Sequence, residues 1–276
     1  MKLNIRPPRE EEWRSCRMLL PETFGDAPAR TYLLGLQDQA PHIVGAASFR
    51  RSEQALTHLR LHVIAPFRRR GIASRLIEQI ASSGVHSMTG TAELSKEPAA
   101  QAFCESNHFV RLDVLNTVEA DIAEMREFMR RLRARMVPAS ARVVPLRDAP
   151  LDQVSQLHAM HVAQEGELNQ WRGLVAATPG MEICPVVMIG ERVVGMLLGH
   201  VEGSMAVVRS RVVASGHHGT WVNAMLLAEA LDIGWAAGAR RARFSYTSSN
   251  HDTRKLALRL RAETTGCLAQ FQRRTG

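Results

Sequence analysis

Residues 59–78 read LRLHVIAPFRRRGIASRLIE, and this stretch decides the fold of the first half of the chain. An apolar strand leads into a turn of three arginines, Gly71 follows, and apolar residues then recur at helical spacing from Ile72 to Ile80. Gly71 lets the backbone turn without a Cβ in the way. The first N–H groups of a helix have no partner within the helix and carry a partial positive charge. The order of strand, basic glycine turn and helix therefore predicts an anion site that suits a phosphate or pyrophosphate.

The turn also carries a spaced motif, Arg68-x-x-Gly71-x-Ala73. This motif resembles the [Arg/Gln]-x-x-Gly-x-[Gly/Ala] pattern that holds the pyrophosphate of coenzyme A in the GNAT superfamily of N-acetyltransferases. The sequence contains neither a Gly-Lys-Ser/Thr loop nor a GxGxxG fingerprint. The resemblance implies acetyl-CoA (coenzyme A) as the cofactor, with these contact residues: Leu61, Val63, Arg68, Arg69, Arg70, Gly71, Ile72 and Ala73. The alternative is a surface turn whose arginines are solvated.

The order of elements extends the resemblance over residues 1–117. Apolar alternation, helical spacing and glycine breaks predict these segments. The expected strands are Leu3–Arg6, Thr31–Leu36, His42–Phe49, Leu56–Val63, Val85–Ala92 and Phe109–Leu115, and the expected helices are Glu10–Leu20, Ile72–Ser82 and Pro98–Ser106. This β-α-β-β-β-α-β-α-β order is that of the GNAT fold.

From Arg142 the same order begins again. The expected strands are Val143–Leu146, Pro185–Ile189, Val193–His200, Met205–Val213, Ala242–Tyr246 and Cys267–Gln272, and the expected helices are Leu151–Ala163, Trp221–Ala236 and Thr253–Ala262. In the counterpart of the basic turn, Gly216 replaces the arginine and Trp221 replaces the small residue. We therefore expect a diverged domain with a degenerate cofactor site, and retention of an acyl-CoA is the alternative. Asn250 either faces a cofactor there or caps the helix that follows.

Residues 119–137 have apolar side chains three and four apart and arginines on the other faces, a pattern typical of an amphipathic helix. We expect this helix to pack on one or both domains; a coiled-coil dimer seam and a basic membrane-surface helix are the alternatives. The sequence thus predicts an α/β (α+β) protein of two tandem GNAT-like domains, each a mixed, mostly antiparallel sheet flanked by helices. The expected boundaries are 1–118 and 141–276, with a linker helix at 119–140.

The resemblance implies acyl transfer to an amine, which needs a base for the amine and an acid for the departing thiolate. His62 projects from the fourth strand on the same face as His58 and Arg60, and is one candidate base. Glu93 at the end of the fifth strand is the other. Where GNAT enzymes commonly carry a tyrosine in the last helix, this sequence has Cys104, the candidate acid. The alternatives are a polar, solvated sheet face for the histidines and a buried apolar role for the cysteine.

Composition narrows the class of ligand. The chain has 276 residues, a net charge of +8 and a pI of about 10.1, which favours anionic ligands. Aromatic residues make up only 5% of it, and no helix-turn-helix, zinc-finger or RNA-binding signature is present, so nucleic acid is a minor alternative. His217 and His218 are adjacent but have no third ligand in register, so we expect no metal site.

The four cysteines have no paired or metal-ligand spacing, the N-terminus lacks the apolar core of a signal peptide, and no apolar run reaches membrane-spanning length. We expect a cytoplasmic protein without membrane association, and a homodimer stays open. The resemblance implies an acyl-CoA-dependent N-acyltransferase, most simply an N-acetyltransferase. It would pass an acetyl group from acetyl-CoA in the first domain to a primary amine of a small molecule or peptide. The alternatives are a non-catalytic acyl-CoA-binding or regulatory module and a basic nucleic-acid-associated protein.

Overall fold

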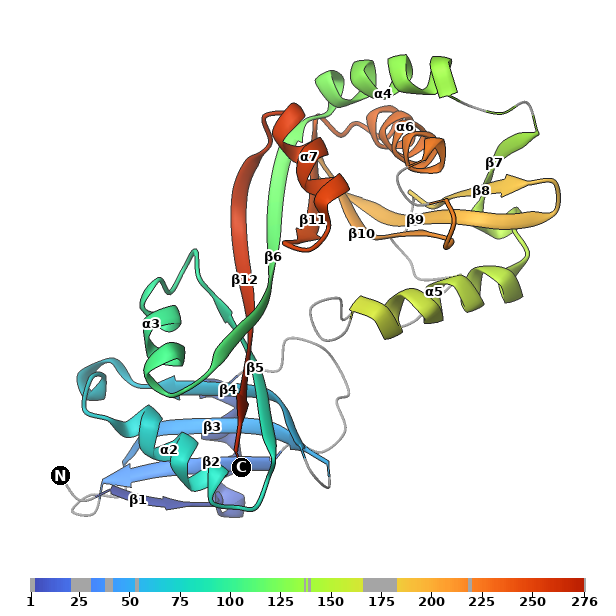
Figure 1. The fold of residues 1–276 in the computed structure, drawn as a ribbon. Helices are drawn as coiled ribbons and strands as arrows, with labels where there is room; N and C mark the ends of the chain where they lie inside the picture. Colours follow the sequence, from blue (N-terminus) through green and yellow to red (C-terminus); the bar gives the residue numbers. More distant parts are fainter. Residues whose placement is uncertain are drawn as a thin grey trace. The chain divides into compact units, whose positions relative to one another are not determined.

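The computed structural model of the chain describes residues 3–20, 31–37, 42–52, 55–136, 138, 140–165, 183–217 and 220–275. The chain forms two compact units (Figure 1). Unit 1 consists of Met1–Val114 and Leu268–Gly276, and unit 2 consists of Leu115–Cys267. In each unit a mixed, mostly antiparallel sheet is flanked by helices, as the sequence predicts.

The sheet of unit 1 has the strand order β1-β2-β3-β4-β5-β12. Its elements are β1 (Leu3–Arg6), η1 (Glu10–Glu12), α1 (Trp13–Leu19), β2 (Thr31–Gln37), β3 (Ile43–Arg51), β4 (Ala55–Val63), η2 (Ala65–Phe67), α2 (Ile72–Ala81), β5 (Ser87–Glu93), α3 (Ala99–Ser106) and the second half of β12 (Glu263–Arg274). β4 and β5 run parallel, whereas the other pairs of this order run antiparallel. The parallel pair therefore sits inside the sheet, next to the helix that follows β4.

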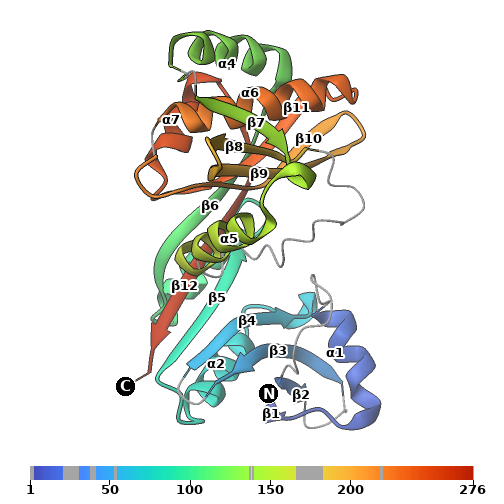
Figure 2. The same ribbon diagram turned by 90° about the vertical axis from the view of Figure 1, so that its right-hand side faces the viewer.

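Two helices cover opposite faces of this sheet (Figure 2). The buried stripe of α2 consists of Ile72, Leu76, Ile77 and Ile80. It packs on a core that includes Leu56, Leu59 and Met88. On the other face, Cys16 of α1 packs against Leu34 and Ala46. The spacing of these apolar residues is what the helical repeat in the sequence predicts.

The sheet of unit 2 has the strand order β6-β11-β10-β9-β8-β7. Its elements are β6 (Val110–Asp121, entering at Leu115), α4 (Ile122–Met136), β7 (Ala141–Pro145), η3 (Leu146–Asp148), α5 (Leu151–Glu165), β8 (Pro185–Ile189), β9 (Arg192–Glu202), β10 (Met205–Val213), α6 (Trp221–Ala236), β11 (Arg241–Thr247) and α7 (His251–Arg259). β10 and β11 run parallel, as β4 and β5 do in unit 1. The two units therefore repeat one topology.

Helices also cover both faces of the second sheet, α4 and α6 on one face and α5 on the other (Figures 1 and 2). α6 buries residues around most of its circumference because α4 lies on the side turned away from the sheet. Arg126 of α4 ties the two helices together, since its guanidinium lies 2.6 Å from an Asp232 carboxylate oxygen and 5.1 Å from the ring centroid of Trp235.

The expected linker at 119–140 is part of unit 2 in the structure. β6 extends to Asp121, whose side chain accepts hydrogen bonds from the N–H groups of Ala123 and Glu124 at 2.8 and 3.0 Å and so begins α4. Met125 and Met129 of α4 are 1% exposed in the core of unit 2. Over the side chains that the structure describes, the amphipathic stripe of the helix is thus covered by its own unit.

The strand that follows α7 also departs from the continuous domains expected at 1–118 and 141–276. Residues Leu268–Arg274 of β12 pair antiparallel with β5, and Phe271 lies opposite Gly90. Ala269 and Phe271 are 0% and 1% exposed in the core of unit 1. In turn, β6 continues past unit 1 and pairs with β11 from Leu115 onward. The sheet of unit 1 is therefore completed by β12, although β6 is the strand that follows α3 in the chain. The sheet of unit 2 is completed by β6, although β12 is the strand that follows α7.

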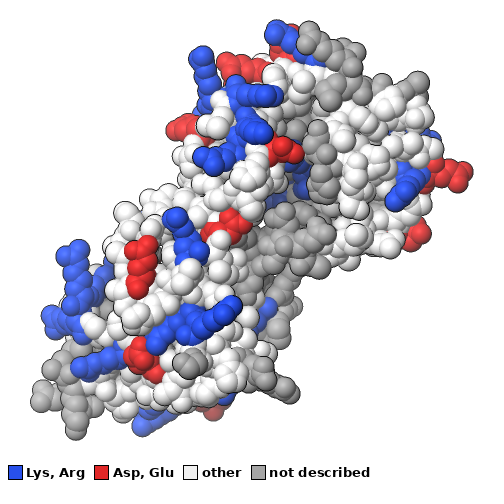
Figure 3. Space-filling model, viewed as in Figure 1, with Lys and Arg blue, Asp and Glu red and all other residues white. Residues whose placement is uncertain are grey.

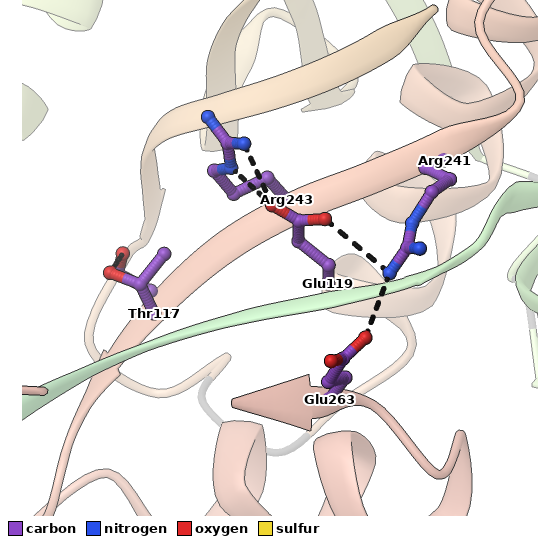
Figure 4. A network of polar contacts seen from close by, with 6 residues as sticks. Thr117, Glu119, Arg241, Arg243 and Glu263 are labelled. Atoms are coloured by element: carbon purple, nitrogen blue, oxygen red, sulfur yellow. Dashed lines mark hydrogen bonds and ion pairs between the residues drawn. The ribbon is translucent and has the colours of Figure 1, made fainter. Parts of the chain in front are cut away.

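Figure 4 shows a polar network on the face of β6 and β11 that carries no core residues. Glu119, whose side chain is 11% exposed, accepts from Arg243 at 2.7 Å and lies 3.4 Å from Arg241. Arg241 also reaches Glu263 at 3.3 Å, and the hydroxyls of Thr117 and Ser245 are 3.0 Å apart. The network pairs opposite charges across neighbouring strands, so we interpret it as an interaction that stabilises the sheet.

Candidate functional site

The basic turn, Arg68–Ala73, joins η2 to α2. Arg69 and Gly71 have left-handed backbone conformations, with φ of 61° and 73°. No side chain caps the helix start at Gly71, and a Cβ there would meet nothing within 4 Å. The helical ladder begins with the N–H of Arg75 donating to the Gly71 carbonyl at 3.0 Å, so the three N–H groups between them have no partner within the helix. The turn is an open group of backbone donors at a helix start, the geometry that binds phosphate.

The three arginines of the turn are exposed, and two of them are held by neighbours. The Nε of Arg68 donates to the Val63 carbonyl at 3.0 Å, which fastens the turn to the end of β4. The guanidinium of Arg70 lies 5.3 Å from the ring centroid of Phe67. Figure 3 shows Lys and Arg side chains on the part of unit 1 that carries the start of α2. The turn thus places positive charge beside the backbone donors.

β4 and β5 diverge next to the turn. The last pair in register between them is Leu59 with Gly90. Beyond it, β4 keeps β3 on one edge, where the N–H of Ile64 donates to a β3 carbonyl at 3.1 Å. Because N–H groups alternate between the two edges of a strand, those of Leu61 and Val63 point toward β5. Two backbone donors therefore face the gap that opens between the parallel strands.

The two candidate bases lie on the same face of unit 1. His62 pairs in register with Ala46, which packs against α1, so His62 faces away from α2. Glu93 pairs with Leu268 of β12 and accepts a hydrogen bond from the Ser95 hydroxyl at 2.5 Å. Neighbouring Ala92 packs in the core on the α2 side, so Glu93 faces the other way. One candidate thus stands on each of the two diverging strands.

Cys104 lies in α3 and packs against the core of unit 1. Burial raises the pKa of its thiol to about 11, and the nearby Glu105 adds a smaller effect in the same direction. The thiol is therefore protonated at neutral pH. Donating that proton to an ordinary thiolate of pKa near 8.5 is uphill by about 3 kcal/mol. The structure gives Cys104 the environment of a buried apolar residue, which makes it a weak acid.

The strand pairings allow the two units to be compared position by position. Gly45 of β3 pairs with Val63 and lies against the first residue of α2. Gly195 of β9 pairs with Val213 and lies against Val222 of α6. Gly195, Val213 and Val222 follow Gly45, Val63 and Ile72, respectively, by the same number of residues. α6 therefore corresponds to α2, and the turn before it corresponds to the basic turn.

This correspondence changes the comparison made from the sequence. Trp221 stands where unit 1 has Gly71, whereas the sequence motif placed it opposite Ala73. The hydroxyl of Thr220 accepts from the N–H of Val222 at 3.4 Å, so α6 carries its own cap. Residues 218 and 219, including His218, lie outside the described part of the chain. The start of α6 thus has a side-chain cap and a bulky residue where α2 has an open glycine.

Two further features of unit 2 involve α7. Arg211 of β10 donates to the Thr253 hydroxyl of α7, and Asn250 accepts from the Thr253 N–H at 3.1 Å. Asn250 is therefore the cap of α7, one of its two expected roles. Matching hydrogen bonds at the C-terminal ends of α3 and α7 place Ala257 where unit 1 has Cys104. Unit 2 has no proton donor at that position.

Among the described residues, no group of three or more His, Cys, Asp or Glu side chains is arranged to hold a metal ion. None of the helices in the described ranges is long and apolar enough to cross a membrane.

Comparison with known proteins supports the resemblance. Residues 3–109 match the model of the acetyltransferase (GNAT) family. A comparison of the sequence with curated proteins finds no match. A GCN5-related N-acetyltransferase from Sphaerobacter thermophilus has a similar structure, with a TM-score of 0.63 and 13% identity over 99% of this chain and 96% of that one.

Two other solved structures are also similar over the whole chain. A tandem GNAT protein from the clavulanic acid biosynthesis pathway has a TM-score of 0.58 and 17% identity, covering 100% of this chain and 99% of that one. A GCN5-related N-acetyltransferase from Anabaena variabilis has a TM-score of 0.61 and 12% identity, covering 100% and 73%. At these identities the likeness shows the fold alone.

The fold and the family match agree on one fold class. The chain has the fold of tandem GNAT proteins, and its residues 3–109 match the model of the acetyltransferase (GNAT) family. This confirms the predicted fold class.

Sequence reasoning missed two features of the site. The first is the bond from Arg68 to the Val63 carbonyl, which depends on how the turn folds back. The second is the left-handed backbone at His58, where β4 carries an irregularity between Leu56 and Leu59. No glycine or proline marks that irregularity, so no local sequence signal could have predicted it.

Proposed function

We propose that the chain is an acyl-CoA-dependent N-acyltransferase that transfers an acetyl group from acetyl-CoA, bound by unit 1, to a primary amine. The observation that carries this proposal is the open start of α2 beside the gap between β4 and β5. The start of α2 can bind the phosphate end of an elongated ligand, and the two parallel strands that diverge next to it, β4 and β5, can hold its other end. The family match over residues 3–109 supports the same assignment.

The residues of unit 1 fit such a ligand. The backbone N–H groups of Ile72 and Ala73, together with Arg69 and Arg70, would hold the pyrophosphate, because unpaired helix donors and guanidinium groups both favour phosphate oxygens. Arg68 would hold the turn in place through its bond to β4.

The backbone of β4 would bind the rest of the cofactor. The N–H groups of Leu61 and Val63 face β5, so they would donate to the carbonyl groups of the acylated arm. When bound, acetyl-CoA supplies the reactive thioester. The strand therefore orients the acyl carbonyl for attack without a side-chain donor.

Glu93 or His62 would take the proton of the attacking amine, directly or through water. The two residues stand on the diverging strands and share a face of the sheet, so an amine on that face would meet the thioester from one side. Cys104 is the remaining candidate for returning a proton to the thiolate. Its raised pKa favours a second candidate function, a non-catalytic acyl-CoA-binding module.

Calorimetric titration of the full chain with acetyl-CoA tests the cofactor site. Arg68→Glu disturbs the anchor of the turn and its charge, and Gly71→Val forces a branched residue into a left-handed backbone. We expect each variant to bind at least about tenfold more weakly, which is about 1.4 kcal/mol. Arg14→Glu, at an exposed position of α1, is the matched charge control and should bind normally. Wild-type affinity in both turn variants would refute the site.

Turnover with a panel of amines separates the enzyme from the binding module. Release of coenzyme A that depends on the amine, with formation of the N-acetyl product, supports the transferase. Binding of acetyl-CoA without transfer to any amine in the panel supports the module instead.

A further inference from the structure

Gly45 is a glycine inside an apolar strand, β3. Glycine in a strand interior costs stability and is often found where another part of the chain approaches closely. Gly45 of β3 lies opposite Gly35 of β2 in the register of the sheet. The two glycines form a part of the sheet surface without side chains, which we call the glycine floor, beneath one residue of α2. That residue is Ile72, the first of the helix.

The contacts at the floor are close. A Cβ at Gly45 would lie 3.0 Å from Cγ2 of Ile72 and 3.2 Å from the His62 carbonyl oxygen. A Cβ at Gly35 would lie 3.5 Å from the same Cγ2, which is ordinary contact. Ile72 is 2% exposed, so it is enclosed by the core and has little room to retreat. Gly45 therefore fixes how deeply the first residue of α2 sits on the sheet.

The two nearest neighbours of the missing Cβ belong to the candidate site. Ile72 follows Gly71 directly, so moving it moves the open N–H groups at the helix start. The His62 carbonyl points toward β3 and belongs to the same peptide group as the Val63 N–H, which points the opposite way, toward β5. A methyl group at Gly45 would thus press on the phosphate-binding and the carbonyl-binding parts of the site at once.

We propose that Gly45 is a positioning residue for cofactor binding: its lack of a side chain sets the start of α2 and the end of β4 at the spacing that acetyl-CoA requires. This inference rests on the proposed function. Gly45 itself touches no substrate and acts through Ile72 and the backbone of β4.

Unit 2 contains a matched control. A Cβ at Gly195 would lie 2.6 Å from Cγ1 of Val222 and 3.1 Å from Cδ1 of Leu226, so the same device holds α6 on its sheet. The start of α6, however, is capped by Thr220. A methyl at Gly195 should therefore disturb the fold at least as much as one at Gly45, but at a place where we expect no cofactor.

The experiment compares Gly45→Ala, Gly195→Ala and Gly35→Ala in the full chain, by calorimetric titration with acetyl-CoA and by thermal unfolding. We expect Gly45→Ala to weaken binding about three- to tenfold and to raise the KM for acetyl-CoA, because displacements of tenths of an ångström at a binding site have effects of this order. Gly195→Ala should lower the unfolding midpoint yet bind within about twofold of wild type, and Gly35→Ala should bind normally.

A rescue variant separates positioning from general damage. Ile72→Leu keeps the side-chain volume but removes Cγ2, the atom nearest to Gly45. The double variant Gly45→Ala/Ile72→Leu should recover part of the lost affinity, because the contact with Ile72 is relieved while the one with the His62 carbonyl remains. This arm also tests the proposal if Gly45→Ala alone folds poorly, since relief of the contact should restore both folding and binding.

Three results would overturn the inference: wild-type affinity in Gly45→Ala, an equal loss of affinity in Gly195→Ala, or no recovery in the double variant. Absence of acetyl-CoA binding by the wild-type chain is a different outcome. It would refute the proposed function and remove the basis of the inference with it.

Discussion

Replacing Phe271 by alanine should destabilise unit 1, although Phe271 follows the whole of unit 2 in the chain. Its side chain is 1% exposed and packs in the core of unit 1. It pairs across the sheet with Gly90, which has no side chain of its own to fill that place. Truncation of a buried phenylalanine to alanine costs about 3–5 kcal/mol, and the bare glycine opposite leaves little to close the cavity.

Hydrogen exchange measured by mass spectrometry reads this effect unit by unit. If opening of unit 1 limits exchange in β5 and α2, a loss of about 3–5 kcal/mol raises the open population by about two to four orders of magnitude. Amides of β8, β9 and β10 should change little. Phe244→Ala, in the core of unit 2 and 7% exposed, is the matched control and should have the reverse pattern.

The result distinguishes two ways of dividing the chain. In the structure, Leu268–Gly276 belong to unit 1, whereas continuous domains at 1–118 and 141–276 would place them in the second domain. If Phe271→Ala accelerates exchange in β8–β10 and leaves β5 and α2 unchanged, the reasoning is refuted. In that case the strand after α7 would stabilise unit 2, as continuous domains require.

Two other predictions concern single side chains of unit 1. Cys104→Ala should keep kcat/KM within about threefold of wild type, because a thiol of pKa about 11 is a poor acid for a thiolate; a fall of tenfold or more in steady-state assays would show that the thiol donates a proton. The hydrogen-bonded Arg6 guanidinium lowers the pKa of Glu12 from 4.5 to about 2, so the folded carboxylate adds stability above pH 4.5 that is lost as the pH falls toward 2. Glu12→Gln should therefore lower the thermal midpoint at pH 7 and flatten its decline between pH 4.5 and 2, and an unchanged slope would contradict the pairing.

Much of the secondary structure follows from local pattern. The predicted ranges Pro185–Ile189, Met205–Val213 and Trp221–Ala236 are those of β8, β10 and α6. In each, a run of apolar residues of suitable length is bounded by a turn or a capping residue, so local signals and tertiary packing agree.

The start of α4 was predicted less well, and the side-chain pattern of residues 117–121 explains why. Val118 and Ala120 point into the core of unit 2, while Thr117 and Glu119 take part in the network on the opposite face. This alternation is typical of a strand, but Glu119 and Asp121 also suit the first turn of a helix. The helical interpretation of residues 119–121 was therefore wrong, and β6 continues to Asp121.

The exchange of β6 and β12 could not be predicted from the sequence. Both strands have the composition of a sheet strand, and composition does not say which sheet a strand joins. The alternation of β12 buries Ala269 and Phe271 whichever unit receives it. The same limit applies to the site: the motif predicts the turn, but the direction of the Leu61 and Val63 N–H groups depends on where the register with β5 ends.

The pairing of β12 with β5 also sets the order in which the chain can finish folding. The paired residues are about 180 positions apart, a separation typical of slow, non-local contacts. Domains of a growing chain generally fold as they leave the ribosome, N-terminal part first. Here the strand that closes the core of unit 1 is synthesised after all of unit 2. The half that carries the candidate cofactor site therefore waits with an unpaired β5 edge, a surface prone to mispairing, until the rest of the protein has been made.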